Sequence, residues 1–261
     1  MHIGVFDSRP CIGEAAAAAA AGIIRNAIAE RGQAFIVAAT GASQFEPLDA
    51  LAQVRDLDWS RTTFFHLDEY IGLPRPHPAS FRRYLQQRIV DRLHPGAFHF
   101  IDGDAPDPAA ECRRLGKLIS ACTIDLAFTG IGENGHLAFN EPPADFETDE
   151  PYIVVSLAET SRQQQVREGW FNTLEDVPAK AISMSVRQIL KSENILCIAP
   201  GEGKARALQS CFEMETSPWC PASVLREHPA TLVYVDSEAA SLLSEATVAA
   251  NWQGAGLGRS T

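Results

Sequence analysis

Short apolar runs alternate along the chain with longer segments in which apolar residues recur at helical spacing. Strands that alternate with helices are typical of a parallel sheet covered by helices on both faces. The sequence therefore predicts one α/β domain over residues 1–261, with a doubly wound, mostly parallel, Rossmann-like sheet. The predicted strands are residues 34–39, 62–67, 124–129, 181–184, 195–199 and 231–235, and the predicted helices are residues 14–31, 47–54, 79–92, 108–121, 203–213 and 237–250.

The predicted strand at 124–129 is followed directly by glycines, a histidine and a carboxylate. Its apolar residues indicate a strand buried on both faces, and Gly130 and Gly132 permit a tight turn after it. His136 and Glu141 then fall within one compact segment. Because ligands of open α/β sheets bind beyond the carboxyl ends of the strands, both side chains are candidate site residues.

Gly130, Gly132 and Gly135 have the G-x-G-x-x-G spacing of dinucleotide-binding turns. In that motif the glycines open a helix whose N-terminus faces a pyrophosphate. Here Pro142 and Pro143 follow soon after and oppose a continuing helix. The context therefore argues against a nicotinamide or flavin cofactor.

An acidic turn follows the predicted strand at 62–67. Asp68 and Glu69 come immediately after this apolar run, so a second strand end carries carboxylates. His66 alternates with apolar neighbours on the strand and is interpreted as a buried structural histidine, with any further role left open. His77, between two prolines, is interpreted as a turn residue.

Two turns between a strand and a helix are candidate anion sites, because backbone N–H groups and hydroxyls at such turns favour phosphate. The first turn consists of Thr40, Gly41, Ala42 and Ser43. The second turn, at 201–204, ends in Lys204 at the start of a predicted helix. A cation is unfavourable there unless an anion is nearby, so Lys204 is a candidate phosphate contact.

Composition narrows the classes of ligand. A formal net charge of −11 argues against nucleic acid or a membrane surface as the main partner, since both require clustered Lys and Arg. The six cysteines show neither a C-x-x-C pair nor the Cys/His spacing of a zinc site, so no metal centre is predicted. The apolar stretch at 15–24 lacks the positively charged segment that precedes a signal peptide core. It is predicted to be a helix of a cytoplasmic protein with reduced thiols.

The acidic turn at 68–74 and the turn with His136 at 135–142 together resemble those of the glucosamine-6-phosphate deaminase/isomerase family. Members carry a D-E-Y-x-G-L-P turn and a G-H-x-x-F-N-E-P turn, which match residues 68–74 and 135–142. The resemblance extends from the turn at 39–43 to Lys204. It implies conversion of an aldose 2-amino-2-deoxy-6-phosphate to a ketose 6-phosphate with release of ammonia. The implied partner is a small amino sugar phosphate, and the chemistry requires no metal or organic cofactor.

The resemblance also implies roles for individual residues. His136 would open the pyranose ring, since imidazole exchanges protons near neutral pH. Asp68 would take the proton from C2 and return it at C1, with its proton affinity raised by desolvation. Glu141 would orient and charge His136, as a carboxylate partner does for imidazole elsewhere. The family's phosphate-contacting positions correspond to Lys204 and Arg167, with Gly41 and Ser43 in the amide cradle.

The chain departs from the family pattern at two places. Asn134 stands where some members carry an aspartate two residues before the histidine. Asparagine cannot share a proton or hold a charge, so Asn134 is expected to orient its neighbours by hydrogen bonds while catalysis is retained. Allosteric members bind an N-acetylated sugar phosphate partly through basic residues after this turn, yet residues 142–158 contain no Lys or Arg. No such activation is expected.

Three alternative functions remain open. A 6-phosphogluconolactonase shares the fold and a similar glycine turn, but its acidic turn usually reads D-E-R where this chain has Asp68, Glu69 and Tyr70. A deaminase/isomerase for the galactosamine epimer differs by the orientation of one hydroxyl, which no motif reveals. A sugar-phosphate sensor would bind without turnover. The oligomeric state is open as well, a homo-oligomer included, because members occur in more than one assembly.

Overall fold

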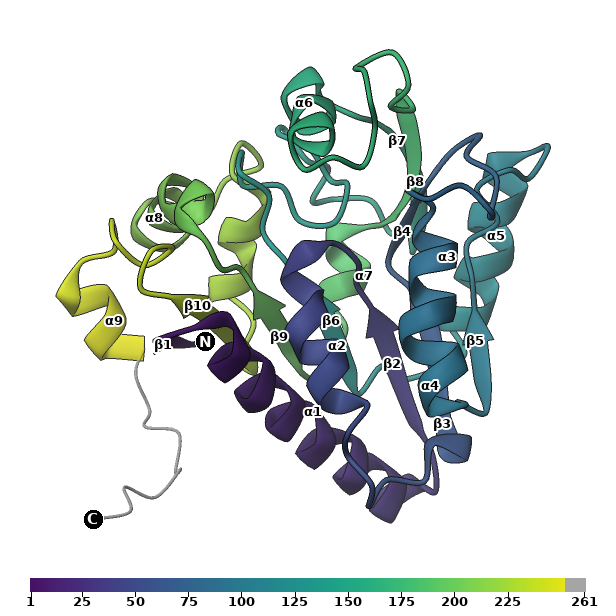
Figure 1. The fold of residues 1–261 in the computed structure, drawn as a ribbon, viewed down its shortest axis with the longest axis horizontal. Helices are drawn as coiled ribbons and strands as arrows, with labels where there is room; N and C mark the ends of the chain where they lie inside the picture. The colour runs from purple at the N-terminus through teal and green to yellow at the C-terminus, as the bar shows by residue number, and fades with distance from the viewer. Residues whose placement is uncertain (252–261) are drawn as a thin grey trace.

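The computed structural model describes residues 1–251 and has a seven-stranded parallel sheet at its centre. The strand order is β1-β10-β9-β6-β2-β3-β5, with every pair of neighbours parallel (Figure 1). This arrangement confirms the predicted α/β class. The strands are β1 (His2–Phe6), β2 (Ala34–Ala38), β3 (Thr62–His66), β5 (Ala97–His99), β6 (Leu126–Thr129), β9 (Ile195–Ile198) and β10 (Thr231–Asp236).

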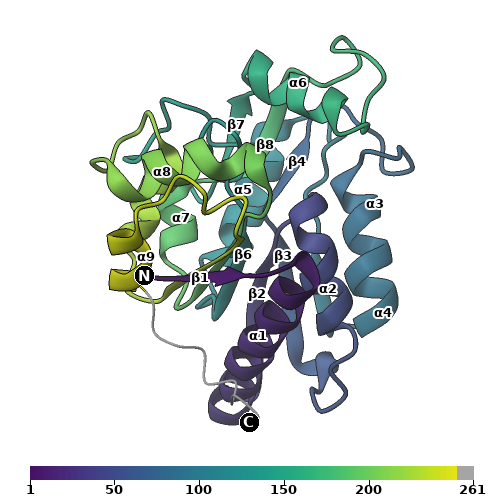
Figure 2. The same ribbon diagram turned by 60° about the vertical axis from the view of Figure 1, so that its left-hand side comes forward.

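Helices cover both faces of this sheet because the direction of winding reverses once. The chain proceeds outward from β2 to β3 and β5, then returns to β6 and continues to β9 and β10 in the opposite direction. Right-handed crossovers place the helices before and after the reversal on opposite faces (Figures 1 and 2). One face carries α1 (Arg9–Arg31), α2 (Phe45–Leu51) and the continuous helix formed by α3 (Phe81–Leu85), η3 (Gln86–Val90) and α4 (Asp91–Leu93). The other face carries α5 (Pro108–Ile119), α7 (Val186–Leu190) and α8 (Ala205–Glu213).

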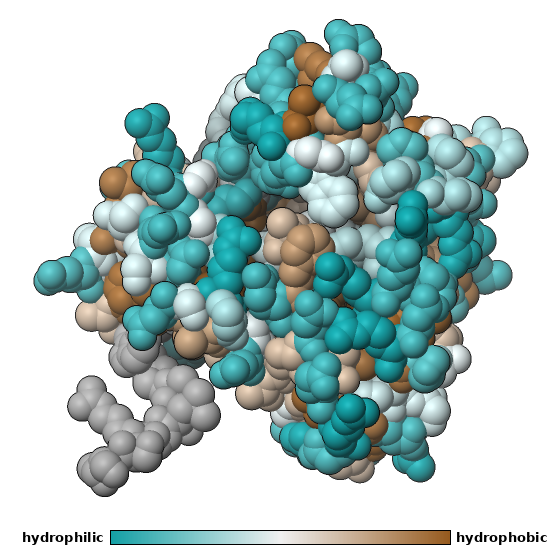
Figure 3. Space-filling model, in the orientation of Figure 1, coloured by the Kyte–Doolittle hydropathy of each residue, from teal (hydrophilic) through white to brown (hydrophobic). Residues whose placement is uncertain are grey.

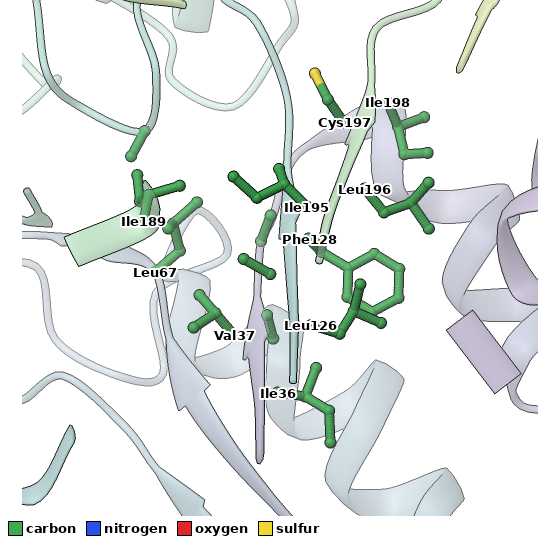
Figure 4. Close-up of a cluster of buried hydrophobic side chains, with 14 of the residues drawn as sticks. Ile36, Val37, Leu67, Leu126, Phe128, Ile189, Ile195, Leu196, Cys197 and Ile198 are labelled. Carbon is green, nitrogen blue, oxygen red and sulfur yellow. The ribbon is translucent and has the colours of Figure 1, made fainter. Parts of the chain in front are cut away.

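Alternating side chains of the central strands form the core on both faces. Figure 4 shows Ile36 and Val37 of β2 on opposite sides of their strand, and Ile195 and Leu196 of β9 likewise. All four side chains are fully buried. A parallel strand buried on both faces has an almost continuous apolar sequence, which is why the sequence pattern located these strands.

The alanine-rich N-terminal segment is a helix of the fold, as the sequence predicted. By length and composition, α1 is apolar enough to span a membrane. Ala16, Ala20 and Ile24 nevertheless lie on a face that is fully buried in the core. Small side chains allow the helix backbone to approach the sheet and α2 closely, and Gly13 lies where a Cβ atom would meet the backbone of Glu46 at 2.8 Å. The segment therefore contributes packing to the interior.

A second, three-stranded antiparallel sheet lies above the carboxyl edge of the parallel sheet (Figure 1). It consists of β4 (Asp68–Tyr70), β8 (Lys180–Met184) and β7 (Tyr152–Ser156), and it is accompanied by α6 (Glu159–Arg167). The prediction of a strand at 181–184 was correct, but its place in the parallel sheet was wrong. Residues 152–156 were not predicted as a strand; in β7 only Tyr152 is buried, and the other four residues are partly or fully exposed.

The predicted helix at 237–250 was partly wrong. Residues 237–243 form turns, and α9 (Glu245–Asn251) begins only after them. The carboxylate of Asp236 accepts hydrogen bonds from the N–H groups of Ala239 and Gly201, which stabilises a turn directly after β10. Side-chain acceptors of this kind compete with helix formation, and the sequence pattern did not reveal the long-range partner Gly201.

Candidate active site

A cavity of about 170 Å³ opens at the carboxyl edge of the parallel sheet. It lies where β2 and β6 are neighbours and the winding reverses, which is the position at which open α/β sheets bind ligands. The turns that follow β2, β3, β6 and β9 all contribute to its wall. Of the residues predicted from sequence, Thr40, Gly41, Ala42, Ser43, Asp68, His136 and Lys204 line this cavity.

Asp68 places a nearly dry carboxyl group in the cavity wall. It begins β4, pairs with Ser183 across the antiparallel sheet and is only 6% exposed. Burial, together with the charge of the adjacent Glu69, raises the pKa of Asp68 to about 8. Within residues 1–251 no hydrogen bond to its carboxylate is formed, so the group can exchange a proton with a ligand.

Glu69 points away from the cavity and anchors the acidic turn. Its side chain is fully buried and accepts hydrogen bonds from the N–H groups of Phe81 and Arg82 and from the hydroxyl of Ser80. These donors lie at the start of α3, where backbone N–H groups lack helical partners. Burial raises the pKa of Glu69, although these hydrogen bonds and Arg82 oppose the increase. Glu69 thus fixes Asp68 relative to α3 and supplies a neighbouring negative charge.

His136 belongs to a hydrogen-bonded cluster with Asn134, Glu141 and Ser161. Its Nδ1 lies 3.5 Å from Oε2 of Glu141 and 3.3 Å from the hydroxyl of Ser161. Asn134 donates from Nδ2 to Oε2 of Glu141 at 2.8 Å, and its Oδ1 accepts from the backbone N–H of His136 at 3.1 Å. The structure therefore brings together the three residues that the sequence predicted at this turn and adds Ser161 from α6.

The charge of Glu141 sets the tautomer of the imidazole. Burial alone would raise the pKa of Glu141, but hydrogen bonds with His136, Ser161 and Asn134 lower it overall. An ionised carboxylate next to Nδ1 favours a proton on that nitrogen. In the described part of the chain Nε2 has no protein partner, so this nitrogen is available to a ligand in the cavity.

Gly132 provides the space that the imidazole occupies. A Cβ atom at this position would lie 2.2–2.4 Å from the ring atoms of His136. Gly132 thus serves packing around the histidine. Gly135, with φ of +83°, supplies the left-handed backbone that returns the chain toward the cavity.

The turn at 40–43 has the backbone expected of an anion cradle. Gly41 has φ of +96°, and a short 3-10 helix, η1 (Ala42–Gln44), follows it. In the described structure the N–H groups of Ala42 and Ser43 have no backbone acceptor, so both can donate to a ligand. Gly201 repeats this geometry with the same φ, followed by η4 (Glu202–Lys204).

Gln44 was not predicted as a site residue, yet it controls the hydroxyl of Ser43. Its side chain is fully buried, and Nε2 donates both to the backbone oxygen of Thr129 and to Oγ of Ser43, each at 3.2 Å. The carbonyl oxygen of Thr129 fixes the orientation of the amide, because only an N–H group can face it. Ser43 therefore accepts from Gln44 and has its own hydroxyl hydrogen free for an acceptor in the cavity.

Two cations line the cavity without a carboxylate partner in the described residues. Lys204 forms no ion pair there, and burial lowers its pKa while Glu168 and Glu133 oppose the decrease. Arg9 was not predicted as a site residue; it extends from the first turn of α1 toward Gly201. Sequence analysis missed it because β1, which positions it, was not recognised as a strand. Two unpaired cations beside a cradle of N–H groups form a site for an anion.

Arg167 lies outside the lining of this cavity. It is exposed and forms an ion pair with Glu133 at 2.6 Å. Both residues border a separate hollow of about 270 Å³ between α6 and the glycine turn, which is the segment at 130–136 after β6. The predicted phosphate contact by Arg167 therefore requires that the side chain leave Glu133, and it stays a prediction.

The remaining histidine predictions concern packing. His66 is fully buried, and burial, with a smaller effect of Arg82, lowers its pKa to about 3. Its Nδ1 accepts from the N–H of Ile101 at 3.4 Å, in line with a structural histidine. His77 accepts from the N–H of Ala79 within a turn. Among residues 1–251 no three His, Cys, Asp or Glu side chains are grouped to hold a metal ion.

Comparison with known proteins assigns the fold and its turns to a family. The family described as glucosamine-6-phosphate isomerases/6-phosphogluconolactonase matches residues 8–234. The chain belongs to this family. This membership confirms the resemblance found in the turns at 68–74 and 135–142.

Relatives within the family are similar over most of their length. The glucosamine-6-phosphate deaminase of Bacillus cereus (strain B4264) is 40% identical over 210 residues, which cover 80% of this chain and 78% of the relative. That of Bacillus cytotoxicus is 38% identical over 248 residues, or 94% of this chain and 90% of the relative.

Solved structures reproduce the fold. A monomeric glucosamine-6-phosphate deaminase superimposes with a TM-score of 0.85 at 33% identity, covering 93% of this chain and all of the other. A 6-phosphogluconolactonase from Thermotoga maritima gives a TM-score of 0.73 at 19% identity over 90% of this chain and 99% of the other. The lactonase similarity concerns the fold alone.

Proposed function

We propose that this chain is a glucosamine-6-phosphate deaminase, converting the amino sugar phosphate and water to fructose 6-phosphate and ammonia. One observation carries the proposal: a single cavity combines a carboxyl group of raised pKa, a histidine paired with a carboxylate, and unpaired cations beside an N–H cradle. The two Bacillus deaminases and the monomeric deaminase support the same assignment.

The phosphate of the substrate binds at the end of the cavity formed by β2 and β9. Its oxygens accept from the N–H groups of Ala42 and Ser43 and from the hydroxyl of Ser43. Lys204 and Arg9 neutralise its charge, and the lowered pKa of buried Lys204 rises again when the dianion arrives. This anchor holds the sugar in one orientation, with its other end toward Asp68 and His136.

Ring opening requires a proton to pass between the anomeric hydroxyl and the ring oxygen. His136 performs this transfer through Nε2, since Nδ1 is occupied by Glu141 and Ser161. Glu141 and Asn134 are positioning residues, because they act through the imidazole and do not line the cavity. Asn134 supplies two hydrogen bonds that need no charge, so the absence of an aspartate there is compatible with catalysis.

Asp68 then moves the proton from C2 to C1 of the open-chain sugar. A base works best when its pKa is near the operating pH, and burial has brought Asp68 into that range. The C2 amino group arrives as an ammonium ion, whose charge lowers the pKa of the adjacent carboxyl on binding. Asp68 is therefore ionised when substrate is present. Water completes the reaction by displacing ammonia at C2.

The test is the formation of ammonia and fructose 6-phosphate from glucosamine 6-phosphate by the purified protein, with Asp68→Asn as control. Equimolar ammonia and ketose phosphate, lost in the variant, is the expected result. Galactosamine 6-phosphate and 6-phosphogluconolactone are assayed in parallel. Faster turnover of the galactosamine epimer would reassign the substrate, lactone hydrolysis alone would reassign the reaction, and tight binding without turnover would indicate a sensor.

The proposed substrate also bears on location and assembly. Amino sugar phosphates are small charged metabolites that do not cross membranes freely, so we place the enzyme in the cytoplasm. The related deaminase of known structure is monomeric, so a monomer is one expected state of this chain and a homo-oligomer is the other.

A further inference from the structure

Two cysteines from different elements meet beneath the glycine turn. Sγ of Cys211, in α8, lies 2.8 Å from Sγ of Cys220, nine residues further along the chain. Both are free thiols. Carbon atoms in van der Waals contact rest at about 3.5–4.0 Å, and sulfur is larger than carbon. At 2.8 Å the two sulfur atoms are therefore closer than van der Waals contact, and a small movement brings them to bonding distance.

We propose that Cys211 and Cys220 are a modification site: a peroxide oxidises this dithiol to an intrachain disulfide, which lowers turnover at the neighbouring cavity. The disulfide itself can be measured without substrate, and only the effect on turnover rests on the proposed function. The sequence did not reveal the site, because the pair has no C-x-x-C spacing and depends on the return of the chain after α8.

The surroundings give the two thiols different reactivities. The thiol of Cys211 donates to Cys220 and thereby lowers the pKa of Cys220, while burial opposes this effect and the N–H of Ser223 and the charge of Arg226 reinforce it. The hydrogen bond and burial raise the pKa of Cys211. Cys220 is half-buried, next to Trp219, which is 70% exposed. Cys220 is thus the thiol that an oxidant reaches first, and Cys211 resolves the product.

The reaction balances with one peroxide. The Cys220 thiolate attacks hydrogen peroxide, forming an S–O bond as the O–O bond breaks, and the departing hydroxide takes the thiol proton to become water. Cys211 then attacks this sulfenic acid, so that an S–S bond forms and the S–O bond breaks. The second hydroxide leaves as water with the Cys211 proton. Two thiols are oxidised and one peroxide is reduced to two waters.

The dithiol is in contact with the turn that carries His136. A Cβ atom on Gly135 would lie 2.9 Å from Sγ of Cys220 and 3.6 Å from Sγ of Cys211, so both sulfur atoms pack on this glycine. The N–H of Ala222 also donates to the carbonyl of Gly135 at 2.9 Å. Disulfide formation draws the sulfur atoms to about 2.05 Å, and a shift approaching 1 Å at a catalytic group costs up to about 100-fold in rate.

The experiment treats the purified, reduced protein with hydrogen peroxide and measures intact mass, free thiols and ammonia release. We expect a loss of about 2 Da as two hydrogens leave, a decrease from six free thiols to four, and a tryptic product in which Cys211 and Cys220 are linked. We also expect kcat to fall about tenfold and to recover with dithiothreitol.

Cys220→Ser is expected to keep its mass and its kcat under the same treatment, whereas Cys122→Ser, at a distant half-buried thiol, is expected to respond like the unmodified protein. An unchanged mass, oxygen addition without a 211–220 linkage, or a linkage that leaves kcat unaltered would each overturn the proposal. If the reduced protein released no ammonia, the deaminase proposal would fail, while mass and thiol count would still decide the disulfide.

Discussion

The carboxyl group of Asp68 retains its proton to a higher pH than an ordinary aspartate, and this makes the rate depend on pH. With a pKa of about 8 in the free protein, kcat/KM should rise by about tenfold per pH unit up to that value and then level off. Steady-state assays between about pH 6 and 9 test this. Glu69→Gln removes the neighbouring charge and should move the rise to lower pH. A rise that stays in place would show that the charge of Glu69 has no part in it.

The same carboxyl group should make the fold less stable as pH increases. Its pKa is 3.8 unfolded and about 8 folded, so the folded protein binds the extra proton and loses stability between those values as pH rises. Asp68→Asn removes this titration. We expect the variant to be more stable than the parent at pH 8, by on the order of 1 kcal/mol or more, and equally stable below about pH 4. Urea unfolding at both pH values measures the difference, and a constant difference would contradict the raised pKa.

Gln44 acts one contact away from the ligand, and its effect should appear in binding. Replacing it with Leu removes the N–H group that occupies Ser43 and leaves the hydroxyl free to rotate. We expect KM to increase about fivefold, since a neutral hydrogen bond contributes about 1 kcal/mol, with kcat changed less. Ser43→Ala should raise KM similarly, and the double variant should add little to either. Additive effects would show that Gln44 does not act through Ser43.

At the scale of elements, the glycine turn after β6 is shaped around the imidazole. Gly132→Ala would place a methyl group 2.2–2.4 Å from the ring of His136, so the ring must move. Because misplacement of a catalytic group by about 1 Å costs up to about 100-fold, we expect kcat to fall by that order. Gly22→Ala in α1, where nothing lies within 4 Å, is the matched control and should leave kcat unchanged. Equal kcat in both variants would exclude the proposed role of His136.

Elements could be predicted from the sequence where burial alone determined their pattern. The strands β2, β3, β6 and β9 are buried on both faces, and their apolar runs were recognised with nearly correct ends. The strands β4 and β5 have three residues each, too few for a period to show. The partners of β8 could not be predicted either, because pairing in the second sheet is set by tertiary contacts.

The residues of the candidate site were likewise predictable only where a local sequence pattern reveals them. Asp68 and His136 stand next to buried strands, so local pattern and family resemblance located them together. Arg9 and Ser161 reach the site from α1 and α6, through contacts that no local pattern encodes. Gln44 lies next to Ser43 in the chain, but its role depends on the buried hydrogen bond to the backbone oxygen of Thr129. These long-range contacts were therefore the part that only the structure could supply.

At the scale of the whole molecule, the surface shown in Figure 3 is mainly hydrophilic, while the cations that matter to the proposed ligand are gathered within the cavity. With a formal net charge of −11, the rest of the surface attracts anions poorly. The cavity between the ends of β2 and β6, where Lys204 and Arg9 lie without carboxylate partners in the described region, is thus the site to which a sugar phosphate is directed.

Activation by a second sugar phosphate is not expected, because the segment after the glycine turn is acidic. Residues 142–158 contain no Lys or Arg, and their Asp149 already pairs with Arg187 at 3.0 Å. The charged side chains of this segment are all carboxylates, and Arg187, which contacts it, is already paired, so like charges oppose the binding of an N-acetylated amino sugar phosphate there. We expect hyperbolic dependence of rate on glucosamine 6-phosphate, unchanged by added N-acetylglucosamine 6-phosphate except through competition at the cavity. A sigmoidal curve that becomes hyperbolic with the added compound would show that another surface of this protein forms an activating site.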